Sequence, residues 1–178
     1  MIRLIYRSVL GCLLALSSTV AVAVDETYMG LQFAGLQLDR DEVDKTFEPS
    51  GLIGRLGASV NDVLFFEGRV GTGLSNDSQE TQEGSVTVDI NYLAGGYGLL
   101  RANVSQTVSP YLIAGATVIE LDSPKEASLD GTETSFSYGV GFDARVSPAL
   151  SFGIEYIRYV GGGGYDLDAL AVGVTGRF

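Results

Sequence analysis

The sequence is poor in the residues that most enzyme and metal sites use. It contains no histidine and a single cysteine, Cys12. The absence of histidine excludes serine–histidine catalysis and histidine-ligated metal sites. One cysteine cannot form a disulfide or a cysteine-based metal site within the chain. Acid–base chemistry by paired carboxylates stays open, but arginines accompany the acidic residues of the predicted strands. We therefore expect no enzymatic activity, no catalytic residue, no metal site and no cofactor.

Basic residues are also scarce. The chain has 11 Lys plus Arg against 22 Asp plus Glu, which gives a formal net charge of −11. Phosphate backbones are bound by basic surfaces, so nucleic acid is not expected as a partner.

Long apolar runs are missing as well, so no transmembrane helix is predicted beyond the N-terminal segment. Residues 1–23 have the pattern of a secretory signal peptide. Arg3 and Arg7 precede an apolar stretch at residues 9–16, and Ala21-Val22-Ala23 forms a small-x-small cleavage site. We expect residues 24–178 to form one exported domain, whose length suits a single core.

What the chain does have is alternation with period two, in segments of about ten residues. The predicted strands are residues 27–38, 51–60, 64–74, 85–102, 110–121, 134–146, 150–160 and 166–178. Long connections at 39–50, 75–84, 122–133 and 161–165 alternate with short ones at 61–63 and 147–149. Long external loops and short periplasmic turns are typical of outer-membrane barrels. The pattern predicts an all-β protein, an eight-stranded antiparallel up-and-down transmembrane β-barrel.

Charge placement decides which face of the predicted sheet points inward. One face carries five acids and five bases, namely Arg55, Glu67, Arg69, Asp89, Arg101, Glu120, Asp143, Arg145, Glu155 and Arg177. Such balance suits a confined lumen, where an unpaired charge is costly. The other face is apolar, with aromatic residues at two levels, Phe142, Phe152, Tyr111 and Phe178 near the periplasmic ends and Phe136, Tyr138 and Tyr156 near the external ends. Two such levels fit aromatic girdles at the membrane interfaces, although an ordinary β-sandwich core is an alternative.

Pleat parity makes the register specific, because a slip of one residue would turn a strand inside out. Three-residue connections that pair Val60 with Leu64 and Val146 with Leu150 keep the charges inside. They place Gly57 opposite Glu67, Arg55 opposite Arg69, Gly141 opposite Glu155 and Gly153 opposite Asp143. We expect an interlocked network that fills the middle of the lumen, formed by Arg55, Glu67, Arg69, Asp143, Arg145 and Glu155.

Two segments carry a resemblance to a known family. Residues 109–116 open the fifth strand, and residues 172–178 end the chain with apolar residues at alternate positions and a final aromatic residue. The chain resembles the OmpA-like transmembrane barrels, the small outer-membrane β-barrel family that includes OmpX-type proteins. The resemblance implies that Val172, Val174 and Phe178 form the signal read by the barrel-assembly machinery. Because the chain stops at Phe178, we expect it to lack the periplasmic peptidoglycan-binding domain of full-length OmpA proteins.

These observations predict a monomer of the cell outer membrane with a structural or surface-interaction role and a closed or nearly closed lumen. The alternatives are a narrow passive pore, or a soluble periplasmic carrier of the lipocalin type. The expected partners are outer-membrane lipid and lipopolysaccharide, and the assembly machinery and periplasmic chaperones during biogenesis. Arg158 interrupts an outward apolar row, and we expect it to contact lipid A phosphate. The acidic first loop either binds divalent cations or is simply solvated.

Overall fold

The computed structural model describes residues 26–40, 43–47, 50–75, 77–81, 84–105, 107–122, 131–160 and 165–178. All regular structure in these ranges is β-strand. No helix among them is long and apolar enough to cross a membrane. The predicted signal peptide, residues 1–23, lies outside the described residues, as do the loop tips at 123–130 and 161–164.

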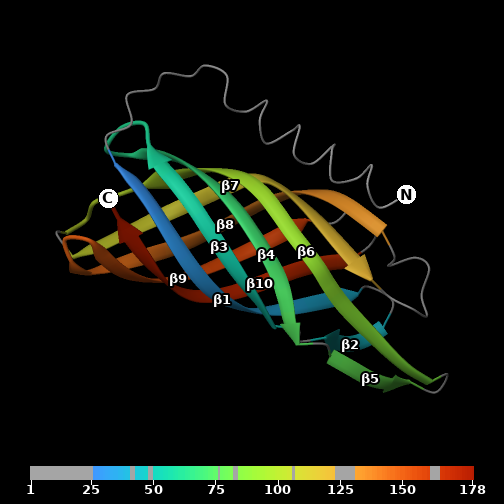
Figure 1. The fold of residues 1–178 in the computed structure, drawn as a ribbon. Helices are drawn as coiled ribbons and strands as arrows, with labels where there is room; N and C mark the ends of the chain where they lie inside the picture. The colour runs from blue at the N-terminus through green and yellow to red at the C-terminus, as the bar shows by residue number, and fades with distance from the viewer. Residues whose placement is uncertain are drawn as a thin grey trace, which may run out of the picture.

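Eight strands close into a barrel (Figure 1). They are β1 (Thr27–Arg40), β3 (Ser50–Ser59), β4 (Leu64–Ser75), β6 (Gly84–Arg101), β7 (Val108–Asp122), β8 (Gly131–Ser147), β9 (Leu150–Val160) and β10 (Tyr165–Arg177). Each pairs antiparallel with the next, and β1 closes the ring against β10, from Tyr28 opposite Arg177 to Arg40 opposite Tyr165. The predicted eight-stranded up-and-down barrel is confirmed.

Two short strands, β2 (Val43–Phe47) and β5 (Asp77–Thr81), extend the sheet at one end. β2 pairs with the end of β1, and β5 pairs with the start of β6. The sequence predicts loops at both places, because neither segment shows alternation; pairing with a neighbouring strand makes them extended. Figure 1 places β2 and β5 at the end of the barrel away from residue 178.

Side chains alternate between lumen and outer surface along each strand, as the period-two pattern predicts. On β8, for example, Phe136, Tyr138 and Val140 are exposed on the outside, whereas Ser137 and Asp143 are buried. The exposed apolar residues recur on all eight barrel strands, and charged residues gather inside. This is the reverse of a soluble protein, and it matches a barrel whose outer solvent is lipid.

The register between β3 and β4 is the predicted one. Arg55 faces Arg69 and Gly57 faces Glu67. Their turn is closed by a bond from the Val60 N–H to the Leu64 carbonyl (2.8 Å) and by the Asn61 side chain, which accepts from the N–H groups of Val63 and Leu64.

Between β8 and β9 the predicted pairing of Val146 with Leu150 is wrong. Leu150 pairs with Ser147 around a two-residue turn at Pro148 and Ala149, and a bulge follows Arg145. The fixed φ of Pro148 suits a tight turn, and the bulge takes up the extra residue. The rest of the ladder therefore keeps the predicted partners, with Gly141 opposite Glu155 and Asp143 opposite Gly153.

Gly57 leaves room for the ring of Tyr28, which extends from β1 over β3 toward β4 inside the barrel. A Cβ at this position would overlap the Tyr28 ring. The ring cannot move aside easily, because its hydroxyl donates a hydrogen bond of 2.6 Å to Glu67. A side chain at Gly96 on the outer surface would meet nothing within 4 Å.

We predict that Gly57→Ala lowers the free energy of unfolding by about 1–3 kcal/mol, the usual cost of overpacking. The matched substitution Gly96→Ala should leave it unchanged or slightly raised, because glycine is unfavourable inside strands. Urea unfolding in phospholipid vesicles measures both. Equal stability of the two variants would contradict the packing described for Tyr28.

Candidate functional site: a buried charge network in the lumen

Five of the six residues predicted to form a network meet in the lumen. Arg55 comes from β3, Glu67 and Arg69 from β4, Asp143 from β8 and Glu155 from β9, and each is at most 4% exposed. Their positions follow from pleat parity, which turns these odd-numbered residues inward.

Arg69 holds two carboxylates at once. Its guanidinium makes a bidentate contact with Glu155, with N–O distances of 2.5 and 2.7 Å, and its Nε donates to Glu67 at 2.6 Å. β4 and β9 lie four strands apart in both directions round the barrel. The Arg69–Glu155 pair therefore bridges opposite walls, with the charge-assisted bidentate geometry that is the strongest of its kind.

A second bridge uses the neighbouring strands. Arg55 lies 3.5 Å from Asp143, and β3 and β8 are also opposite one another. Arg55 also lies 3.6 Å from Glu67 and donates to Thr175 at 2.9 Å. Arg55 therefore joins the Asp143 carboxylate to the Glu67 carboxylate in one continuous network.

Arginines from two other strands extend the network toward the end of the barrel that carries residues 26 and 178. Arg101 of β6 donates to Asp143 at 2.8 Å, and Arg177 of β10 lies 3.9 Å from the same carboxylate. Arg177 also contacts Glu26 at 2.7 Å, at the start of the described chain. Four arginines thus contact three buried acids and Glu26, whose side chain is 36% exposed, so each buried guanidinium has an acidic partner.

Tyrosines supply further hydrogen bonds to the buried carboxylates. Tyr28 donates to Glu67 at 2.6 Å and Tyr111 donates to Glu155 at 2.9 Å. The guanidinium of Arg101 stacks over Phe65 at 4.6 Å, and that of Arg69 lies 4.9 Å above Tyr97. Aromatic faces and hydroxyl groups replace much of the water that these charges would otherwise hold.

Two sequence-based expectations are corrected here. Arg145 is exposed near the β8–β9 turn and lies outside the buried network, because the lumen has already opened to solvent at that level. Tyr111 faces the lumen instead of the lower girdle. Its strand has apolar residues on both faces, Leu112 and Ile113 among them, so alternation alone could not show which set points inward.

Sequence reasoning placed Arg101 and Arg177 on the inward face but outside the network, and it missed Tyr28 and Glu26. The only pattern in the sequence that bears on these residues is the alternation along each strand, which assigns each residue to the inner or the outer face. Parity does not tell which residues of non-neighbouring strands reach the same height in the lumen.

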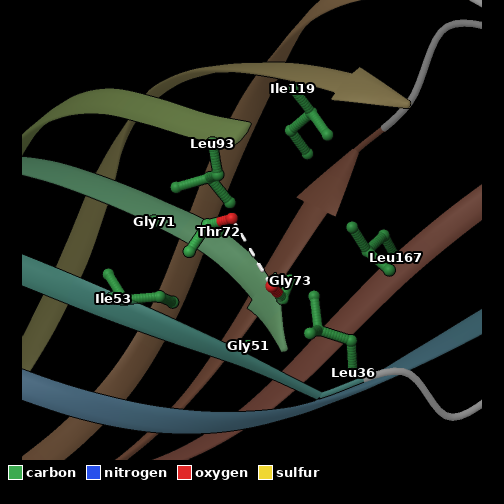
Figure 2. A pocket seen from close by; sticks show the side chains of 9 residues that line it. All are labelled: Leu36, Gly51, Ile53, Gly71, Thr72, Gly73, Leu93, Ile119 and Leu167. Carbon is green, nitrogen blue, oxygen red and sulfur yellow. Dashed lines mark hydrogen bonds between the residues drawn. The ribbon is translucent and has the colours of Figure 1, made fainter. Parts of the chain in front are cut away.

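The lumen changes character above the network. Five aliphatic side chains from five strands converge there, as Figure 2 shows: Leu36, Ile53, Leu93, Ile119 and Leu167. The space left among them is 10 Å³, roughly what one water molecule requires. This apolar layer was not predicted, because the charge argument treated the inward face as polar throughout.

The chemistry of the lumen is that of mutual neutralisation. Each buried carboxylate of the network contacts at least one guanidinium. In the described part of the chain, no group of three or more His, Cys, Asp or Glu residues could hold a metal ion. The arrangement joins opposite walls and fills the space between them.

The other predicted site residues lie on the outer surface. Val172, Val174 and Phe178 are exposed there, and the Phe178 N–H donates to the Thr27 carbonyl at 3.0 Å. Arg158 forms a bidentate ion pair with Asp168, with N–O distances of 2.7 and 2.6 Å. A contact of Arg158 with lipid A phosphate stays a prediction.

Comparison with known proteins gives a family match over residues 8–178, to the outer membrane protein beta-barrel domain. One similar solved structure is Ail, the attachment invasion locus protein of Yersinia pestis, in complex with the heparin analogue sucrose octasulfate. It is 17% identical with a TM-score of 0.60, over 86% of this chain and 98% of that one. Neisserial surface protein A is 15% identical with a TM-score of 0.61, over 85% and 97%. The outer membrane protein OprG from Pseudomonas aeruginosa is 9% identical with a TM-score of 0.62, over 86% and 95%. No curated protein matches the sequence.

We predict that Glu67→Ala lowers the free energy of unfolding by about 3–5 kcal/mol, because it leaves the buried charges of Arg55 and Arg69 undercompensated. Arg145→Ala, which removes an exposed charge, should change it by less than about 0.5 kcal/mol. Urea unfolding in vesicles compares the two. If Glu67→Ala proves as stable as Arg145→Ala, the network does not hold the barrel together.

Proposed function

The chain belongs to the outer membrane protein beta-barrel domain family, and from this premise we propose that it is a closed barrel that presents its external end to partners at the cell surface. The integral outer-membrane barrel is common to the family. The closed lumen and the surface role are the specific parts of the proposal.

The observation that carries the proposal is the filled lumen. Eight strands enclose an interior only just wide enough for side chains. Here the Arg69–Glu155 bridge crosses that interior, and the aliphatic layer lies above it. An ion would have to displace both layers, one charged and one apolar. This arrangement supports a closed barrel over the narrow-pore alternative.

The carrier alternative would need a polar outside and an apolar chamber. The outer surface instead exposes large apolar residues such as Phe33, Leu112 and Phe152. The space among the five aliphatic side chains is far smaller than the few hundred Å³ that a ligand pocket occupies. Both facts weigh against a soluble carrier.

The surface role rests on the end of the barrel that carries β2 and β5. Residues 26 and 178 lie at the opposite end of the barrel (Figure 1); we propose that this end faces the periplasm, so that β2 and β5 extend outside the membrane. The segment around β2 is acidic, with Asp39, Asp41, Glu42, Asp44 and Glu48. Ail is described in complex with a sulfated heparin analogue; like charge disfavours such a polyanion here, so we propose a partner that presents basic or neutral groups.

We propose no enzymatic role, since the buried carboxylates are engaged by arginines. During biogenesis, Val172, Val174 and Phe178 would present the C-terminal signal to the barrel-assembly machinery, delivered by periplasmic chaperones. Once folded, the barrel would work as a monomer surrounded by outer-membrane lipid.

We predict that the purified wild-type protein shows no frequent, stable conductance in planar bilayers, because the lumen is filled at two levels.

On intact cells, a variant with residues 41–48 replaced by glycine and serine should assemble normally but lose binding to surfaces coated with basic protein. Heparin-coated surfaces serve as the control and should retain neither strain. Stable channels would refute the closed lumen, and undiminished binding by the loop variant would refute the surface role.

We also predict that deletion of Phe178 slows insertion and leaves protein in the periplasm, because the assembly signal loses its final aromatic residue. Phe152→Ala removes an exposed aromatic from the same outer surface and should insert at the wild-type rate. Pulse-chase labelling with protease digestion of intact cells follows both. Wild-type amounts of surface-accessible protein after the deletion would refute this role of Phe178.

A further inference from the structure

A charged pair lies on the outer surface at the upper edge of the apolar band. Arg158 of β9 faces Asp168 of β10 directly, and the residues below Asp168 on its strand, Leu170 and Val172, are apolar and exposed. Tyr138 pairs with Arg158 on the other side. The row of the pair is therefore the level where hydrocarbon gives way to head groups, the level at which aromatic residues such as Tyr138 concentrate.

The two charges are not equally exposed. The Asp168 side chain is 12% exposed, whereas the Arg158 side chain is 35% exposed. Asp168 engages Arg158 through Nε and Nη2. The carboxylate thus holds the planar guanidinium in one orientation and leaves the cation as the more accessible partner. Pairing also makes a charged side chain tolerable at the edge of the hydrocarbon.

Two grooves flank this pair. Groove A, of 520 Å³, lies mainly over β1 and β10; its apolar part is lined by Phe33, Gly35, Tyr156, Leu170 and Val172, and its polar part by Gln37, Ser50 and Asp168. Groove B, of 580 Å³, lies over β6 to β9 and is lined by Gly98, Leu112, Ala114, Val140 and Tyr156, with Tyr138 beside it. Both volumes fall in the range of about 300–1,000 Å³ that is typical of ligand sites.

Tyr156 lines both grooves and forms the ridge between them. Each groove contains a glycine with open space above it. A Cβ at Gly35 of groove A would meet nothing within 4 Å, and a Cβ at Gly98 of groove B would meet only the Ala114 carbonyl, at 4.0 Å. A ligand that fills both grooves needs hydrocarbon chains that diverge from one head group, with an anionic group near Arg158.

We propose that Arg158 and grooves A and B bind one molecule of lipid A, with a phosphate at Arg158 and acyl chains in both grooves. Lipid A carries several acyl chains on a disaccharide with phosphate groups, so its chains can straddle the Tyr156 ridge. The two chains of a phospholipid leave neighbouring atoms of one glycerol and fit one groove better than two. A guanidinium suits phosphate recognition because its donors match the oxygens in pairs. The assignment rests on the proposed orientation, which places this row in the outer leaflet.

The head-group arm uses the full chain reconstituted in phosphatidylcholine nanodiscs with added lipid A, with bound lipid counted by native mass spectrometry. Arg158→Gln should bind lipid A about tenfold more weakly or worse, as expected for loss of charge-assisted hydrogen bonds. Arg145→Gln removes an exposed arginine at the opposite end and should bind like the wild type. Equal losses in the two variants would mean bulk charge attraction and overturn the site.

The groove arm uses leucine to occupy the space that the acyl chains would take. Gly35→Leu and Gly98→Leu should each weaken lipid A binding, by about fourfold for every methylene kept out of the groove. Gly68→Leu is the matched control, because Gly68 is an exposed outer glycine with similar free space on β4 and belongs to neither groove. Unchanged binding after either groove substitution would show that this groove holds no chain.

Phosphatidylglycerol, titrated in the same nanodiscs, separates the two sources of an anionic lipid. The expected result is weaker binding than lipid A and little response to Gly98→Leu. If phosphatidylglycerol binds as tightly as lipid A and loses the same affinity in the Arg158 and glycine variants, the site accepts any anionic lipid and the assignment to lipid A is overturned. Bilayer recordings on the same preparations report the lumen independently, so failure of the lipid site is distinguishable from failure of the closed-barrel proposal.

Discussion

The bridge between Arg69 and Glu155 is the interaction on which the interior of this barrel depends. It spans the lumen between strands that lie on opposite sides of the ring. A ring of eight strands has an interior about as wide as two long side chains that meet at its centre, so a charge placed there must find its partner across the gap or remain buried alone. Glu67, Arg55 and Asp143 extend the same solution downward, each by contact with a group of opposite sign.

This constraint divides the molecule by charge. Inside, four arginines contact three buried acids and the partly exposed Glu26, because the low dielectric makes any unpaired charge expensive. The surplus of acid in the sequence is carried elsewhere, including the segment around β2. The barrel wall is apolar outside, and its buried charges are paired inside. The proposed closed lumen and the proposed binding by an acidic external end both follow from this separation of charge.

The outer wall has its own exception to the apolar rule in Arg158 and Asp168. Within the lumen, charges are paired because an unpaired buried charge is costly; on the outer surface, this pair lies at the edge of the exposed apolar residues, and Arg158 remains the more accessible partner. The grooves beside it exist because Gly35 and Gly98 have no side chains to fill them. The glycines at Gly57 and Gly141 serve the opposite purpose, since they make room inside for Tyr28 and Tyr111. Glycines on different strands therefore shape the inner and the outer surface of the wall.

Sequence alone determined the features that depend on near neighbours along the chain. Alternation assigned most side chains to a face, and the short connection at 61–63 gave the register that sets Gly57 opposite Glu67. Only the tertiary structure decided that Arg145 stays outside the network, that Arg101 joins it, and that Tyr111 faces inward. Parity and turn length are local properties, which fix a side and a partner on the adjacent strand. The height at which residues of distant strands meet depends on the tilt of the strands and on how β1 closes against β10, and no local pattern records either.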